Sequence, residues 1–173
     1  MRTPSTGRQS TKAMTDVDFL FGLPLHPLVV HAAVVLLPLA AAGVIVVALA
    51  PKLRARYAGL VVVLSALALG VMPIAQESGE GLMEYVDFTE ATTQHVELGE
   101  SGVAAGFAVF LSALALWLLQ RRMRGGRRVK PWLRNGVAAI AIVASLGATF
   151  QIARIGHTGA TSVWEEVGSY SQG

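Results

Sequence analysis

The chain of 173 residues contains no cysteine. Disulfides, thiolate zinc sites, iron–sulfur clusters and covalently attached c-type haem are therefore excluded, and any cofactor would need nitrogen or oxygen ligands. Charge is also scarce, because only 14% of the residues are charged while 53% are hydrophobic. The mean hydropathy of +0.55 would leave a soluble domain with too much exposed apolar surface. The composition therefore indicates a membrane protein.

Long apolar stretches without charge give the fold class. Four of them approach the roughly 20 residues that cross a hydrocarbon core, and none alternates with the period of two that a barrel strand shows. The sequence predicts an all-α integral membrane four-helix bundle. The predicted segments are a flexible polar segment at 1–22, a transmembrane domain at 23–167 with helices at about 24–50, 57–76, 90–120 and 132–157, and a tail at 168–173.

Basic residues are confined to two of the predicted connections. Ten of the fourteen lysines and arginines lie at 52–56 and 121–134, and neither stretch contains an acid. Cytoplasmic loops of membrane proteins carry such an excess, so the pattern predicts a multi-pass protein of the cytoplasmic membrane with both termini outside. The pI near 9.7 is explained by anionic lipid headgroups at these loops, and no nucleic-acid partner is expected.

All four histidines fall at the predicted outer end of the bundle: His26, His31, His95 and His157. Imidazole binds haem iron and also zinc, copper and nickel, so the cluster predicts a cofactor or metal site. If Pro27 takes the first helical position, His31 lies about one turn inside the helix, and His26 lies about 140° away around it. We expect His31 to bind iron with His95 or His157, while His26 holds a propionate or binds a second centre. Four scattered histidines at a membrane boundary would also need no ligand.

Two further features accompany the histidines. His95 is followed on one helix face by Gly99, Gly102 and Gly106, a pattern typical of close helix packing that would also admit a macrocycle. Arg154 lies one turn before His157 and needs a partner. We expect a structural ion pair with an acidic residue of the outer connection, or a haem propionate. The acidic residues considered are Glu77, Glu80, Glu97 and Glu100.

Other catalytic signatures are missing from the sequence. There is no glycine-rich phosphate loop, no HExxH pair, no GxSxG elbow and no internal repeat that would indicate a transporter with inverted halves. We therefore expect neither a hydrolase nor a nucleotide-binding protein, and no enzyme that acts on its own.

Three segments carry a family resemblance: LPLHPLVVH, SGEGLMEY with QHVELGE, and IGHTGATSVWEEV. Together they resemble the bacterial membrane family known as domain of unknown function 2231 over Leu23 to Val167. The resemblance implies a four-helix protein of the bacterial cytoplasmic membrane. The positions that match the family's motifs are His26, Pro27, His31, His95, Gly156, His157 and Gly159.

The chain departs from the family's pattern after His157. Ala160, Val163 and Trp164 stand where Gly-Gly, Val-Tyr and a further His-Gly are expected, which weakens a second ligand there.

Three functions remain open from the sequence. The first is a b-type haem at the outer end that transfers electrons to a membrane redox partner. The second is a cofactor-free scaffold or accessory subunit in the lipid bilayer, whose glycine face packs a partner. The third is an outward-facing divalent-metal site formed by His31, His95 and His157 with carboxylates. An optical spectrum and bound-metal analysis separate the three.

Overall fold

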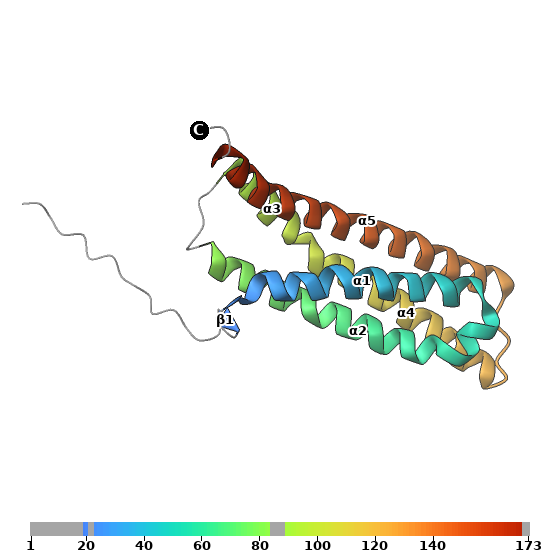
Figure 1. Cartoon of the computed structure of the whole chain (residues 1–173). Coiled ribbons are helices and arrows are strands. Elements are labelled where there is room, and N and C mark those ends of the chain that lie inside the picture. The colour runs from blue at the N-terminus through green and yellow to red at the C-terminus, as the bar shows by residue number, and fades with distance from the viewer. Residues whose placement is uncertain (1–18, 21–22, 84–88, 171–173) are drawn as a thin grey trace, which may run out of the picture.

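The computed structural model describes residues 19–20, 23–83 and 89–170. Two short strands, β1 (Phe19–Leu20) and β2 (Leu23–Pro24), pair antiparallel, with Phe19 opposite Pro24 and Leu20 opposite Leu23. Five helices follow, as Figure 1 shows: α1 (Leu25–Leu49), α2 (Pro51–Leu82), α3 (Glu90–Gly99), α4 (Ser101–Arg124) and α5 (Pro131–Tyr170).

Four helical segments are long and apolar enough to cross a membrane, which confirms the predicted all-α fold with four spans. They are Leu25–Leu49, Pro51–Leu82, Glu90–Arg124 and Pro131–Ser162. Large apolar side chains such as Val35, Ile140 and Val143 are exposed on their outer faces. Such a surface suits lipid rather than water, because hydrocarbon solvates these side chains at no cost.

Several helix boundaries differ from the sequence prediction. The second helix begins at Pro51 rather than at 57, because proline lacks only an N–H that has no partner in a first helical turn. The third predicted helix is divided at Glu100 into α3 and α4, and the Thr89 side chain caps α3 by accepting from the Thr92 amide at 3.2 Å.

The chain ends also bear on the predicted segments. Helix α5 continues to Tyr170, so the predicted tail at 168–173 is helical over its first three residues. Residues 1–18 and 21–22 of the predicted N-terminal segment, and residues 171–173, lie outside the described residues.

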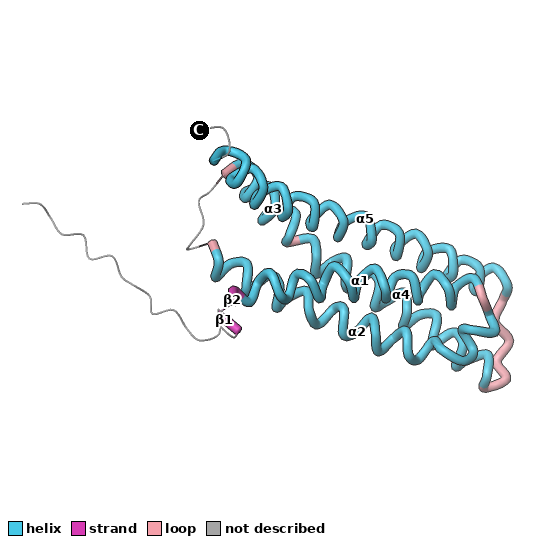
Figure 2. The backbone as a smooth tube through the Cα atoms, viewed as in Figure 1, coloured by secondary structure: helices cyan, strands magenta, loops and turns pink. Residues whose placement is uncertain are grey.

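The spans form a ring in the order α1, α2, α4 and α5, so α1 and α4 lie diagonally across the bundle, and α3 packs mainly on α5. We call the end where α1 begins and α5 finishes the histidine end (Figure 1). The opposite end, where loops join α1 to α2 and α4 to α5, is the arginine end (Figure 2). Between them, Leu37, Val44, Val109 and Leu116 are fully buried.

Helices α2 and α5 repeat one pattern at a spacing of 80 residues. Both begin with Pro-x-Leu-Arg, at residues 51–54 and 131–134. Their buried positions coincide under the same spacing: Val61, Ser65, Ala68 and Met72 in α2 correspond to Ala141, Ser145, Ala148 and Ile152 in α5. The two helices therefore present equivalent faces to the core.

Helices α1 and α4 repeat in the same way at a spacing of 69 residues. The buried residues Ala33, Leu37, Ala40, Val44 and Val47 correspond to Gly102, Gly106, Val109, Ala113 and Leu116. The fold is thus two helical hairpins that run in the same direction and are related by a pseudo-two-fold axis along the bundle. The sequence analysis excluded only inverted halves and missed this parallel repeat.

Candidate functional site: a pair of histidines

The first histidine of the site is anchored to the neighbouring helix of its own hairpin. His26 lies at the start of α1, and its Nδ1 is 3.0 Å from the carbonyl oxygen of Ala75 and 3.2 Å from Ser78 Oγ, both on α2. The Ser78 hydroxyl donates to the same carbonyl. Because a carbonyl oxygen only accepts, Nδ1 of the neutral ring carries the proton and donates it, which leaves Nε2 with a free lone pair.

The second histidine repeats this arrangement in the other hairpin. His95 of α3 places its Nδ1 3.1 Å from the carbonyl oxygen of Ile155 and 3.3 Å from Thr158 Oγ1, both on α5. The Thr158 hydroxyl donates to the Ile155 carbonyl. Ala75 and Ser78 of α2 are the residues that correspond to Ile155 and Thr158 under the 80-residue spacing, so the two anchors are equivalent.

A glycine lies directly beside each imidazole. A Cβ added to Gly79 would meet the His26 ring at 2.9 Å, and a Cβ added to Gly159 would meet the His95 ring at the same distance. Real Cβ contacts are not that short, so any side chain at these positions must displace the ring. Each anchor is therefore a hydroxyl residue followed by glycine, and each glycine gives the imidazole its place.

His26 and His95, which we call the histidine pair, meet across the bundle. Their ring centroids are 6.3 Å apart and the ring planes cross at 72°. Both residues are half-buried, and neither Nε2 forms a hydrogen bond with any other described residue. One nitrogen lone pair from each hairpin is thus left for a ligand near the pseudo-two-fold axis.

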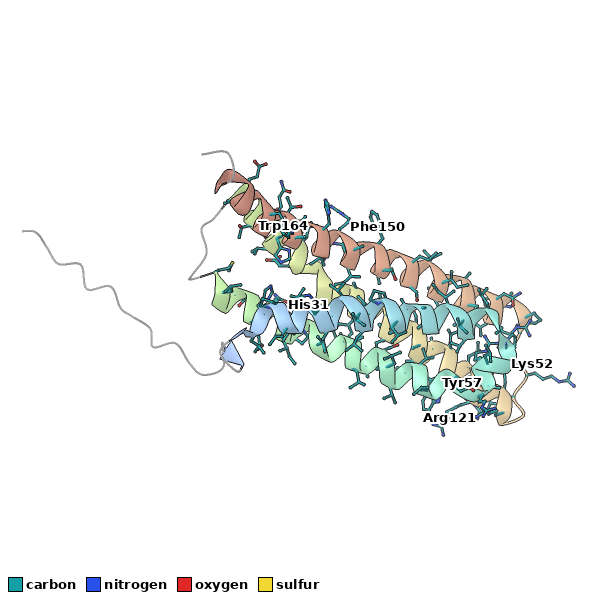
Figure 3. All side chains as sticks on the ribbon, in the orientation of Figure 1. His31, Lys52, Tyr57, Arg121, Phe150 and Trp164 are labelled. Carbon is teal, nitrogen blue, oxygen red and sulfur yellow. The ribbon has the colours of Figure 1, made fainter. Side chains whose placement is uncertain are left out.

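The other two histidines lie elsewhere at the same end. His31 is exposed and its Nδ1 bonds to the carbonyl oxygen of Pro27 in its own helix, and Figure 3 labels it on α1. His157 is exposed on α5. Over the described ranges no three side chains of His, Asp or Glu converge into a metal site, so His31, His95 and His157 are not brought together. His26 and His31 occupy different faces, as their spacing predicts.

Arg154 and His157 share a face of α5, as predicted. They line an open hollow of about 330 Å³ together with apolar side chains that include Leu98 and Phe150. Thr158 also lines it and bonds to His95, so the hollow adjoins the histidine pair. Arg154 is exposed and forms no ion pair with a described residue, so the expected bridge to a glutamate is absent from this part of the chain.

The glycines of α4 serve helix packing. A Cβ at Gly106 would lie 3.1 Å from Leu69 Cδ1 and 3.4 Å from Leu69 Cα, and Gly102 faces Met72 and Ile155. Gly99, by contrast, has no atom within 4 Å of an added Cβ. The close-packing interpretation of Gly102 and Gly106 is confirmed, and α2 approaches α4 where the glycines leave space.

The sequence analysis missed the anchors of the histidine pair. Ser78 and Thr158 lie 80 residues apart, each is followed by glycine, and the Pro-x-Leu-Arg segments have the same spacing. That shared spacing was the signal that could have placed His26 opposite His95.

Fold and site together define a membrane-spanning four-helix protein that presents two anchored histidines at one end. The chain belongs to the family described as "Predicted membrane protein (DUF2231)", whose model matches residues 22–171. No curated protein and no solved structure matches the chain.

Proposed function

We propose that the protein binds a b-type haem through His26 and His95 and transfers electrons at the histidine end, which the charge pattern predicts to be the outer face of the membrane. The observation that carries the proposal is the histidine pair itself. Each imidazole comes from a different hairpin and is fixed by a backbone carbonyl at Nδ1. Haem ligands are commonly oriented in this way by a partner on the second ring nitrogen. The bound haem would supply an iron that alternates between the ferric and ferrous states.

The ring separation supports a single metal centre. Bonds from a metal to imidazole nitrogen are about 2.0–2.1 Å long, so two imidazoles on opposite sides of one ion have centroids about 6 Å apart. The observed 6.3 Å agrees with that arrangement.

The number of ligands favours haem over a bare divalent ion. Structural zinc takes four protein ligands, and the described residues offer no third His, Asp or Glu beside the pair. Haem iron receives four nitrogens from the porphyrin and needs only two axial ligands. The proposal therefore assigns His26 the axial role that the sequence analysis gave to His31. Arg154, which has no described carboxylate partner, stays our choice for a propionate.

The test is a reduced-minus-oxidised optical spectrum of the detergent-purified chain after haem is supplied. The variants are His26→Ala and His95→Ala, with His31→Ala and His157→Ala as matched controls from the same end of the bundle. We expect a b-type spectrum in the unmodified chain and in both controls, and its loss in each of the first two variants.

Two outcomes contradict the proposal. A spectrum that survives His26→Ala but disappears in His31→Ala would restore the ligand set expected from sequence. A colourless protein would remove haem altogether, and elemental analysis of the same samples would then separate a metal site from a cofactor-free scaffold.

A further inference from the structure

An arginine at the opposite end of the bundle is buried without a partner. Arg54 lies in the first turn of α2 and is only 2% exposed. Its Nε is buried and has no hydrogen-bond acceptor, and the guanidinium donates to no other residue in the described ranges. A buried charge is costly unless it is paired and hydrogen-bonded, so this guanidinium calls for an anion.

The chain cannot supply that anion itself. The nearest interacting charge is Arg134, which has the same sign. No Asp or Glu occurs in the sequence from 19 to 76 or from 101 to 164, so all eleven acids belong to the termini or to the connection at the histidine end. The counter-charge for Arg54 must therefore come from another molecule.

The local backbone favours the same kind of ligand. Helices α2 and α5 both begin at the arginine end, and the N-terminus of a helix carries partial positive charge. Ala50, at the N-cap of α2, offers no side-chain cap to the first amides of that helix. Through the repeated Pro-x-Leu-Arg segment, α5 contributes Arg134, which is exposed and donates from Nε to Asn135 Oδ1 at 3.3 Å.

The position of this end relative to the bilayer indicates which anions are within reach. Arg56 lies over the Tyr57 ring at 5.4 Å and Arg121 over the Trp117 ring at 4.8 Å. Aromatic rings paired with cations are typical of the headgroup level. Figure 3 shows Lys52, Tyr57 and Arg121 gathered at this end of the bundle. Phosphate groups are the anions concentrated there.

We propose that Arg54 and Arg134 form a phosphate-binding site at the arginine end, one arginine from each hairpin. Guanidinium groups match phosphate oxygens through two parallel N–H donors, which gives geometry as well as charge. The phosphate belongs either to a phospholipid headgroup or to a phosphorylated solute. The site is independent of the histidine pair and of any haem.

The experiment measures thermal unfolding of the full chain in maltoside micelles, which contain no phosphate. Inorganic phosphate and phosphatidylglycerol are added in separate arms, each against chloride at equal ionic strength. The variants are Arg54→Met and Arg134→Met, and Arg56→Met is the matched control because it removes the same charge from an exposed position in the same helix.

We expect the unmodified chain and Arg56→Met to gain on the order of 5 °C in at least one arm. Arg54→Met and Arg134→Met should lose that gain, and Arg54→Met should be at least as stable as the unmodified chain without ligand. The arm that produces the shift identifies the source of the phosphate.

The proposal fails if neither phosphate nor phosphatidylglycerol stabilises the unmodified chain. It also fails if Arg56→Met loses the gain to the same extent, since the effect would then be general charge screening. Should Arg54→Met not fold, the exposed Arg134→Met decides the outcome.

Discussion

Substituting Gly79 by alanine tests whether the His26 ring is held as described. The new Cβ would lie 2.9 Å from the ring's Cε1 and 3.2 Å from Nδ1, so the imidazole must move away from α2. That movement breaks the 3.0 Å bond from Nδ1 to the Ala75 carbonyl. The anchor and the glycine are therefore tested by one methyl group.

The expected magnitude follows from three contributions. Alanine in place of a helical glycine stabilises by about 1 kcal/mol. Loss of the hydrogen bond costs about 1 kcal/mol, and forcing a side chain into occupied space costs about 1–3 kcal/mol. The control is Gly70→Ala in the same helix, where an added Cβ has nothing within 4 Å and only the favourable contribution applies. Gly79→Ala should therefore be about 2–4 kcal/mol less stable than Gly70→Ala.

The assay is equilibrium unfolding in mixed micelles, followed by far-ultraviolet circular dichroism. It reports on the ring's packing without any cofactor, so it does not depend on the proposed function. Gly159→Ala and its control Gly147→Ala should behave in the same way for His95, because Gly147 also has open space around it. Equal stability of Gly79→Ala and Gly70→Ala would refute the described packing.

Three further predictions concern the rest of the bundle. Gly106→Val should push α2 from α4, because even its Cβ would lie 3.4 Å from the Leu69 backbone, and we expect a loss of more than about 2 kcal/mol in the same unfolding assay; wild-type stability would contradict the close approach. Ser145→Ala should be neutral or stabilising by up to about 1 kcal/mol, since its hydroxyl is buried without a partner, and a clear loss of stability would show that the hydroxyl has one. Since the chain has no native cysteine, Arg128→Cys should react with an impermeant maleimide only from the cytoplasmic side of oriented vesicles and Thr93→Cys only from the outside; the reverse labelling would invert the predicted topology.

The four spans could be predicted because hydrocarbon imposes one requirement on every residue it contacts. Apolar runs of the right length satisfy it, and the exposed Val143 and Ile140 show that lipid-facing positions need nothing more specific. The helix ends were less predictable. Pro51 starts a helix directly after Ala50, and the charged Lys52 and Arg56 lie within that helix, so charge did not mark its boundary.

The membership of the site was harder to infer than its location. All four histidines lie at one end as expected, yet depth along the helix suggested His31, whereas facing decided for His26. Facing depends on how α1 packs on α2, and that depends on Gly79 and Ser78, which carry no signal when viewed singly. Only the spacing shared by the two hairpins contained the information.

The burial of Arg54 could not be inferred from sequence either. Arginines in a short basic loop are normally solvated, and the neighbouring Arg56 is indeed exposed. The difference between the two arises because positions two apart on a helix point to different faces, and only the packed bundle shows which face is covered.

Electron paramagnetic resonance of the oxidised, haem-supplied protein tests the central claim most directly, because the signal of ferric haem reports its two axial ligands. We predict a low-spin signal from two imidazoles in the unmodified chain and in His31→Ala, and conversion to high spin or loss of haem in both His26→Ala and His95→Ala. An unchanged low-spin signal in either of the last two variants would show that the histidine pair does not hold the iron.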